Sequence, residues 1–538
     1  MRNIWIKASV WRFLVLSCIL LVALGLRLWG SGFGLPAYTR YHPDEHALVD
    51  RAAAILWTGD WNLHRFNYPP FYAYVQAGAY ALYFLKGAAQ GLWSEVPPFT
   101  LPNYYQVGRV VTALAGTLTV LVVYLVGREM VRRRTGLLAA ALLAGCYLHI
   151  IHSHYATFDV MVGLLAALTL LFSTLILACG QAGGRAPAPL YLLAGLCAGL
   201  AGATKYNGAV VLVVPLVAHV LATRWGAWGW LDGRIVLAGA GFALGFFGGN
   251  PFALANLPEF LKGLATVLYH YGTQQPGFEG RGNWRWYPAI FLTSPDALFV
   301  VTGAAGMVGL LVRRWKMGLV LIAFPVVYYV MVSRFVVRFE RNLVPVLPFL
   351  AVGGGWLLDA AAVWAARKLR WQAPRGQALA ALGALLVLVL PVLAGLMFDS
   401  ALAGRDHREA AGDWIEENVE WGTKIAIEHY AVPFDHTEYW VEDVIRISDH
   451  DLAWYMAEGF DLLVVSDGVW EVLREQPEVY RDRLAALDEL TAASTLLASF
   501  QANPPALVVA GYPTVDVYHF APVHIYALPG AMARGAED

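Results

Sequence analysis

The sequence predicts a polytopic α-helical membrane protein that carries a small extracytoplasmic α/β domain at its C-terminal end. Of its 538 residues, 58% are hydrophobic and only 14% are charged, and the mean hydropathy is +0.52. These values exclude an ordinary soluble enzyme. The chain has no basic stripe with interleaved aromatic residues, so nucleic acid is not an expected partner.

Eleven apolar runs account for the membrane prediction, because a helix needs about 20 mostly apolar residues to cross a bilayer. The segment 70–92 is also apolar, but counting it as a crossing would place the basic residues Arg128 to Arg134 outside the cell. We therefore expect it to lie in, or dip into, the outer leaflet. The predicted crossings lie near 11–32, 106–127, 136–152, 158–179, 188–204, 207–222, 234–250, 288–312, 317–333, 342–364 and 378–398.

Loop charge sets the predicted orientation. Basic residues favour the cytoplasmic side, and Arg2, Lys7 and Arg12 precede or begin the first run. That run has no small-residue cleavage site, so we expect a retained helix rather than a removed signal peptide. A cytoplasmic N-terminus and eleven crossings place the C-terminal domain outside. The expected location is the plasma or inner membrane, with long outer loops at 33–105 and 251–287.

A domain boundary is predicted near residue 400 by the distribution of charge. Residues 401–538 hold 25 of the 39 acidic and 8 of the 38 basic side chains, so a net charge of about +16 is followed by one of about −17. We expect a transmembrane catalytic domain over 1–399 and a soluble α/β domain over 400–538. Within the soluble domain, the patterns predict helices at 407–418, 450–458 and 477–490, and strands at 424–428, 461–466, 515–520 and 524–528.

The segment Tyr41-His42-Pro43-Asp44-Glu45-His46, just after the first apolar run, is the strongest candidate site. Charge beside a bilayer is costly and is usually functional. One carboxylate could instead satisfy the amides at a helix start. That alternative does not explain two adjacent carboxylates together with two imidazoles, so we predict a functional site.

A second polar cluster follows the third run, with His152, His154 and Asp159 on the same predicted side of the membrane. Asp159 could cap the next helix, and His154 could satisfy a buried backbone group. Two acidic sites that converge on one outer cavity are also how acid–base chemistry is assembled. We therefore count Asp159 among the candidate catalytic residues.

Lys205, Arg338 and Arg341 are basic residues at outer boundaries, where the loop-charge rule makes them exceptions. They could be snorkelling anchors. The alternative is an anionic ligand such as a lipid phosphate, which arginine grips with two donors and lysine attracts as a point charge.

A divalent metal is a possible cofactor, because imidazole and carboxylate suit zinc or manganese. The candidate ligands are His42, Glu45, His46 and His152. The four cysteines, which lie in apolar segments without the paired spacing of a zinc site, are expected to be small buried hydrophobes.

The order of these motifs resembles the GT-C superfamily of polyprenyl-phosphate-dependent glycosyltransferases. Within it, the chain is similar to protein O-mannosyltransferases and lipid A aminoarabinose transferases, that is, glycosyltransferase family 39 or 83. The resemblance covers about residues 11–365. It rests on His42-Pro43-Asp44-Glu45, Gly59-Asp60-Trp61, Tyr68-Pro69-Pro70-Phe71, His152 to Asp159, Gly199-Leu200-Ala201 with Thr204-Lys205-Tyr206, and Arg341 with Pro345 and Pro348.

The resemblance implies that Asp44 is the catalytic carboxylate, with Glu45 beside it and Asp159 as the second acid. It also implies a sugar donor on a polyprenyl phosphate, an extracytoplasmic acceptor hydroxyl and inversion in a single displacement. Tyr68 stands where many aminoarabinose-type members have lysine, which argues against an aminoarabinose donor and a lipid A acceptor. The expected substrate-binding residues are Lys205, Arg338, Arg341, His154, His46 and Tyr68.

Two other classes of function remain open at this level. A transporter or flippase could use the same charges to move a lipid or solute, but it would favour internal repeats and ionisable groups near the membrane centre. A scaffold or sensor could use the outer domain as its receptor. The gathering of charge at one predicted surface favours the transferase.

Overall fold

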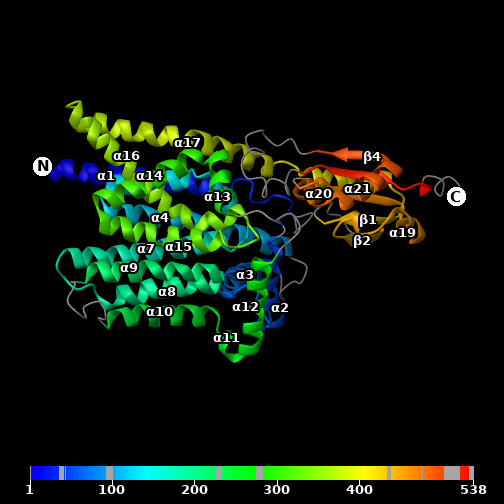
Figure 1. Cartoon of the computed structure of the whole chain (residues 1–538), viewed down its shortest axis with the longest axis horizontal. Coiled ribbons are helices and arrows are strands. Elements are labelled where there is room, and N and C mark those ends of the chain that lie inside the picture. The colour runs from blue at the N-terminus through cyan, green and yellow to red at the C-terminus, as the bar shows by residue number, and fades with distance from the viewer. Residues whose placement is uncertain are drawn as a thin grey trace.

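The computed structural model describes residues 2–35, 42, 44–92, 101–223, 233–273, 283–429, 431–432, 438–474, 476–501 and 521–531. A helical bundle forms one end of an elongated molecule and a small α/β domain forms the other (Figure 1). The long helix α17 (Ala373–Ala403) leads from the bundle into the α/β domain. The structure thus has the two parts that the composition predicted.

Each of the eleven predicted runs coincides with a helix or a pair of helices. Among the described residues, six helices are long and apolar enough to cross a membrane, and two bent pairs bring the number to eight. Three further helical segments are apolar but shorter, so eleven crossings remain a prediction. The bundle elements are α1 (Arg2–Leu28), α4 (Leu101–Met130), α5 (Arg133–Ala144), α6 (Tyr147–His154), α7 (Asp159–Gln181), α8 (Ala188–Thr204), η1 (Tyr206–Leu212), α9 (Val213–Ala222), α10 (Arg234–Gly249), α13 (Asn283–Thr293), α14 (Ala297–Arg313), α15 (Trp315–Val332), η3 (Glu340–Val346), α16 (Leu347–Lys368) and α17.

Small residues let the bundle helices approach closely, as is common in membranes. The contact of α8 with α10 is an example, because a Cβ on Gly195 would lie 2.0 Å from the carbonyl oxygen of Ala238. The four glycines Gly195, Gly199, Gly241 and Gly245 all face the partner backbone in this way. Backbone contact, rather than large side chains, therefore sets the spacing of this pair.

Two spans are broken near the site, and one carboxylate joins the two breaks. Helices α5 and α6 meet at 58°, and α13 and α14 meet at 117°. Asp296, which precedes α14, accepts hydrogen bonds from the backbone N–H groups of Tyr147 at 2.9 Å and Leu148 at 2.8 Å. These N–H groups open α6 and have no partner within the helix. Asp296 therefore holds the short helix that carries His152 and His154.

The two predicted outer loops contain helices of their own. They gather at the end of the bundle that faces the α/β domain (Figure 1). The apolar segment 70–92 forms one of them, and its predicted place in the outer leaflet remains a prediction. The helices are α2 (His46–Thr58), α3 (Phe71–Ala89), α11 (Phe252–Ala255) and α12 (Leu257–Gly272).

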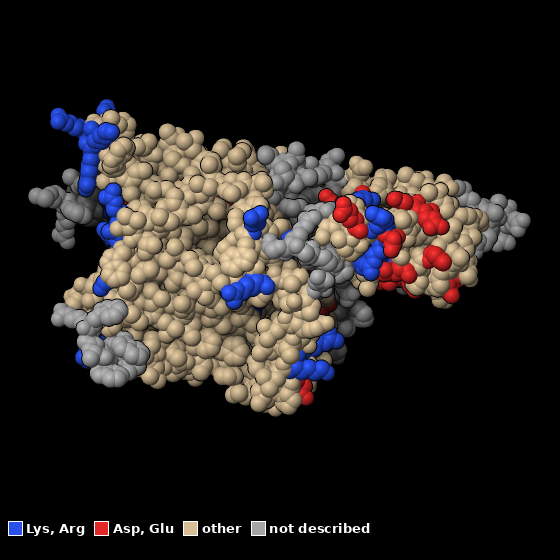
Figure 2. Space-filling view, in the orientation of Figure 1, with Lys and Arg blue, Asp and Glu red and all other residues tan. Residues whose placement is uncertain are grey.

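Charge divides along the molecule as the loop-charge rule expects. Figure 2 shows lysine and arginine gathered at the bundle end remote from the α/β domain, and aspartate and glutamate spread over the α/β domain. The predicted orientation places the basic end in the cytoplasm and the acidic domain outside, and it remains a prediction.

The C-terminal domain is a five-stranded sheet in the order β2-β1-β3-β5-β4. Strands β2, β1 and β3 run parallel, whereas β5 runs antiparallel to β3 and β4. The helix at 407–418 and three of the four expected strands are present; the expected strand 515–520 lies outside the described residues. The elements are α18 (His407–Asn418), β1 (Lys424–Glu428), β2 (Trp440–Val444), η4 (Ile447–Asp449), α19 (Leu452–Ala457), β3 (Leu462–Ser466), α20 (Asp467–Arg474), α21 (Arg481–Ala493), β4 (Thr495–Phe500) and β5 (Val523–Ala527).

Four elements of this domain were not predicted: β2, β4, α20 and the short 3-10 turn η4. Strands β2 and β4 form the edges of the sheet, and their side chains are mostly exposed or half-buried. Edge strands therefore lack the run of apolar residues that identifies the buried β3. The helix α20 follows β3 without a linking residue, which conceals it in the sequence.

Candidate active site

Asp44 lies in the first predicted outer loop, directly before Glu45 and α2, and pairs with Arg341 of η3, almost 300 residues further along the chain. The Arg341 Nη2 atom is 2.9 Å from Oδ2 of Asp44, and both side chains are partly exposed, at 17% and 29%. The backbone N–H of Asp44 donates to Nδ1 of His42 at 3.2 Å. Arg341 therefore holds the carboxylate and His42 holds the backbone of Asp44, while part of the Asp44 side chain stays exposed.

A second acid–cation pair lies nearby and is more deeply buried. Lys205 follows α8 and donates to Oδ1 of Asp159, the first residue of α7, at 2.7 Å. The same ammonium lies 3.4 Å from Oδ1 of Asn342, whose amide donates to the hydroxyl of Tyr287. Asp159 is the first residue of α7, but Phe158 occupies the N-cap position, so the capping alternative is wrong and the Asp159 carboxylate instead holds a lysine in place.

Three consecutive residues of η3 join these groups. Arg341 reaches Asp44, and Asn342 reaches Lys205. The residue before them, Glu340, lies 3.8 Å from Nε2 of His152 on α6. One short 3-10 turn therefore connects the first outer loop, the start of α7, the end of α8 and the end of α6.

Glu45 has a different role from its neighbour. Arg109 of α4 donates to both of its carboxylate oxygens, at 2.9 and 2.8 Å, and the backbone N–H of Ala156 donates to one of them at 2.9 Å. Both side chains of the ion pair are fully buried. A carboxylate held by three donors and closed to solvent positions the loop, and it has no open face for a substrate.

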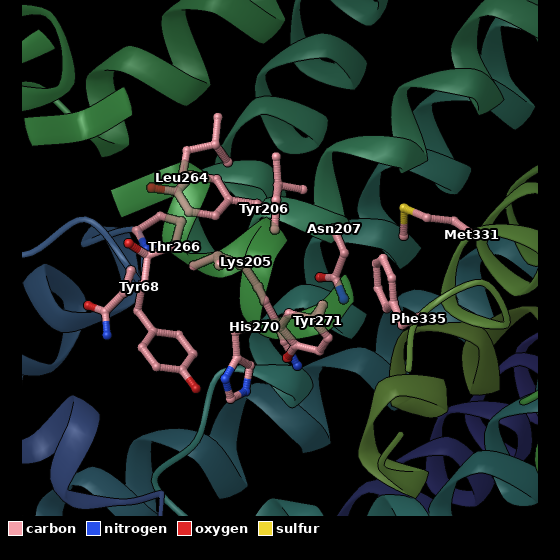
Figure 3. Close-up of a pocket in the computed structure, with 14 residues that line it drawn as sticks. Tyr68, Lys205, Tyr206, Asn207, Leu264, Thr266, His270, Tyr271, Met331 and Phe335 are labelled. Atoms are coloured by element: carbon pink, nitrogen blue, oxygen red, sulfur yellow. The ribbon is translucent and has the colours of Figure 1, made fainter. Parts of the chain in front are cut away.

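An apolar pocket of about 410 Å³ opens beside Lys205. Figure 3 shows Lys205 surrounded by residues from the first outer loop, from α12 and from the end of α15. Most of the lining is apolar or aromatic, which suits a hydrocarbon chain whose charged end reaches the lysine. The lining residues are Asn67, Tyr68, Pro69, Lys205, Tyr206, Asn207, Leu264, Thr266, Val267, Leu268, His270, Tyr271, Met331 and Phe335.

Tyr68 forms part of this pocket wall. Its ring stacks on Phe158, with 4.8 Å between centroids and 1° between planes. Burial, with the nearby Asp44 carboxylate as the next cause, raises the pKa of the Tyr68 phenol to about 12. The hydroxyl is therefore neutral at pH 7 and able to donate a hydrogen bond to an anion.

Three other predicted binding residues lie apart from these pairs. His46 is exposed at the start of α2. Arg338 packs over the ring of Trp286, 5.1 Å from its centroid. The ring nitrogens of His154 lie 2.9 Å from the carbonyl of Trp29 and 3.0 Å from that of Ile150. The surroundings of Arg338 and His154 are those of residues that join helices.

The candidate metal ligands do not form a metal site. In the described ranges, no three His, Cys, Asp or Glu side chains come together in a group able to hold a metal ion. Glu45 is held by Arg109, and Nδ1 of His42 accepts from a backbone N–H group. These residues do not fit a divalent cation, and the proposed reaction does not require one.

Sequence reasoning missed Arg109, Glu340 and Asn342. Arg109 lies within a predicted membrane run, and an ionisable residue there is a functional candidate by default. That signal was available in the sequence. Glu340 and Asn342 flank the predicted Arg341, but their importance depends on contacts with α6 and with Lys205 that no local pattern reveals.

Comparisons with known proteins give a family match over part of the chain and a fold match over almost all of it. Residues 103–251, from α4 to just past α10, match a family model described as dolichyl-phosphate-mannose-protein mannosyltransferase. No curated protein sequence gives a significant match.

Solved structures with a similar fold extend over almost the whole chain. The oligosaccharyltransferase of Archaeoglobus fulgidus in its apo form gives a TM-score of 0.54 at 13% identity, covering 94% of this chain and 78% of that one. ArnT from Cupriavidus metallidurans bound to undecaprenyl phosphate gives 0.53 at 16%, covering 97% and 98%. AglB from Archaeoglobus fulgidus, in complex with an inhibitory peptide and a dolichol-phosphate, gives 0.53 at 14%, covering 95% and 78%.

At these identities the likeness to the solved structures is one of fold. The family match adds a second finding over the segment that contains Asp159 and Lys205. Residues 103–251 are thus similar to the dolichyl-phosphate-mannose-protein mannosyltransferase family, and almost the whole chain has the fold of the oligosaccharyltransferase and ArnT structures.

Proposed function

We propose that this protein transfers a sugar from a polyprenyl-phosphate carrier to a hydroxyl group of an extracytoplasmic protein, glycan or lipid acceptor, with inversion. The observation that carries the proposal is the pairing of each candidate acid with a cation, Asp44 with Arg341 and Asp159 with Lys205, beside an apolar pocket. The solved relatives that hold undecaprenyl phosphate or dolichol-phosphate support a carrier of this chemical class.

The protein binds the donor at two places, its hydrocarbon chain and its phosphate. Its hydrocarbon chain lies in the pocket beside Lys205, and its phosphate lies between Lys205 and Arg341. Charge-assisted hydrogen bonds from these cations, and one from the neutral phenol of Tyr68, hold the phosphate oxygens. The sugar then extends toward Asp44, which has an exposed face.

The reaction is one displacement at the anomeric carbon. Asp44 accepts the proton of the acceptor hydroxyl, the acceptor oxygen bonds to the anomeric carbon, and the bond from that carbon to the phosphate oxygen breaks. The polyprenyl phosphate leaves with the electron pair. Arg341 and Lys205 stabilise this charge, which grows in the transition state. Attack opposite the leaving group inverts the anomeric configuration.

The same geometry couples donor binding to the base. Without donor, Arg341 holds Oδ2 of Asp44. An incoming phosphate competes with Asp44 for that guanidinium, and it competes with Asp159 for Lys205. Donor binding therefore frees the carboxylate oxygen that the acceptor proton needs, so the base is released only when a donor is present.

The decisive experiment uses the full chain reconstituted in liposomes with a radiolabelled polyprenyl-phosphate sugar. Release of polyprenyl phosphate together with label on an acceptor, lost in Asp44→Asn, would support the transferase. Movement of intact labelled lipid across the bilayer, without release of polyprenyl phosphate, would support a flippase instead. Mass spectrometry of glycans and glycoproteins from cells with and without an active copy would identify the acceptor.

A further inference from the structure

His152 and Glu340 form a buried polar pair that the proposed reaction does not use. His152 is 0% exposed and Glu340 is 1% exposed. Both ring nitrogens and both carboxylate oxygens lack a hydrogen-bond partner in the described part of the chain. Their closest approach, from Nε2 to Oε1, is 3.8 Å, which is beyond hydrogen-bond range. Nearly all buried polar atoms in proteins have a partner, so four without one suggest a ligand.

Glu340 is linked to the reacting groups through its neighbour in sequence, and His152 is linked to them through ring contacts. Glu340 directly precedes Arg341, which holds Asp44. His152 lies beside Tyr155, whose ring centroid is 4.1 Å from that of His42 in a tilted contact. His42 in turn accepts a hydrogen bond from the backbone N–H of Asp44. The unpaired atoms therefore lie close to the place where the phosphate and base require the sugar of the donor.

We propose that His152 and Glu340 recognise the sugar of the lipid-linked donor by hydrogen bonding to two neighbouring hydroxyl groups. The inference rests on the proposed function and deepens it. A carboxylate has two acceptor oxygens that can take the O–H groups of adjacent hydroxyls, and an imidazole offers one donor and one acceptor. This set of groups complements a diol.

The inferred donor class follows from the diol, because the unpartnered atoms of His152 and Glu340 match the donors and acceptors of two neighbouring hydroxyls. This class is a hexose or pentose that carries adjacent free hydroxyls.

The test measures binding, so it needs no acceptor. Purified full-length protein in nanodiscs is titrated with undecaprenyl phosphate, with undecaprenyl-phosphate mannose, and with deoxy analogues that lack one sugar hydroxyl each. In the wild type, the sugar should improve affinity over the bare carrier, and removal of one recognised hydroxyl should cost at least about tenfold. Glu340→Gln should lose most of this discrimination and still bind undecaprenyl phosphate normally.

Two variants separate this inference from general damage. Glu259→Gln, on the exposed face of α12, is the matched control and should behave like the wild type. Arg341→Ala should weaken binding of both the bare and the sugar-bearing carrier. If Glu340→Gln does not fold, His152→Gln provides the same comparison, with bare-carrier binding as its folding control.

The outcomes are distinct. Unchanged discrimination in Glu340→Gln or His152→Gln would overturn the sugar-recognition inference while leaving the carrier site intact. If the wild type binds neither the bare nor the glycosylated carrier, the proposed function itself fails.

Discussion

The guanidinium of Arg341 lies 2.9 Å from the carboxylate of Asp44, although the two residues are almost 300 positions apart in the sequence. This ion pair joins the first outer loop to η3, and both partners remain partly open. It places the candidate base and the candidate phosphate ligand in direct contact. The first two predictions follow from this contact.

Asp44→Asn should abolish sugar transfer and leave the fold intact. Loss of a general base typically costs about 10²-fold or more in rate, and the partly exposed carboxylate contributes little packing. Transfer assays and thermal unfolding in detergent would measure the two effects. Asp60→Asn, at an exposed aspartate of the same loop paired with His64, is the matched control. Activity above roughly a tenth of the wild type would count heavily against Asp44 as the base.

Lys205→Ala and Arg341→Ala should raise the apparent KM for the lipid-linked donor and lower turnover, because both cations hold the charge that grows on the leaving phosphate. Arg341→Lys should restore only part of the activity, since a point charge cannot reproduce a two-donor fork. Steady-state kinetics with varied donor would test both statements. Normal donor kinetics in the alanine variants would place the phosphate site elsewhere.

Arg109→Ala should strongly destabilise the protein, because it leaves the Glu45 carboxylate buried without its cation. Breaking a buried ion pair typically costs about 3–5 kcal/mol. Adding Glu45→Gln should recover part of this loss, and denaturation in mixed micelles would measure both variants. Arg128→Ala, in the partly exposed pair with Glu129, should cost less than about 1 kcal/mol. Equal effects at the two arginines would contradict the structural role of Arg109.

His42 predicts a loss of stability and activity in acid. Burial, with Arg341 as the next cause, holds the pKa of His42 well below its usual 6.5. The unfolded chain therefore binds the proton more readily, so stability falls as pH drops through about 6.5. Protonation would also remove the acceptor for the Asp44 backbone N–H. His42→Asn should make stability less sensitive to pH between 5 and 7.

The control for this prediction is His64→Asn, at an imidazole whose side chain is 67% exposed. Its stability profile over the same pH range should follow that of the wild type. Thermal unfolding measured at several pH values would compare the three proteins. An unchanged slope in His42→Asn would assign the acid sensitivity to another group.

Membrane orientation can be tested by cysteine labelling in intact cells, in a background from which the four native cysteines have been removed. Single cysteines at Asn62 and at Glu458 should react with an impermeant thiol reagent, and one at Arg133 should not. Membrane disruption should then expose all three sites, which controls for local accessibility. Labelling at Arg133 together with protection at Glu458 would overturn the predicted orientation.

The sequence by itself determined the elements whose signal is local. Every predicted membrane run lies on a helix or a pair of helices. A run of about 20 apolar residues favours a membrane helix by its own composition, whatever distant residues contribute. The buried strands β1 and β3 were recognisable for the same reason. Asp44, Asp159, Lys205 and Arg341 were identifiable because charge at a predicted membrane boundary is costly.

The tertiary structure decided which of these charges meet, because pairing depends on how segments far apart in the chain pack together. Asp44 and Glu45 are adjacent in sequence and both are carboxylates, yet one lies open beside Arg341 and the other is enclosed by Arg109. The edge strands β2 and β4, the pocket beside Lys205 and the unpaired His152 and Glu340 arise in the same way. Several helices and loops together form the surroundings of each of these groups. The burial of a side chain and the residue that it pairs with then determine whether it can contact a substrate.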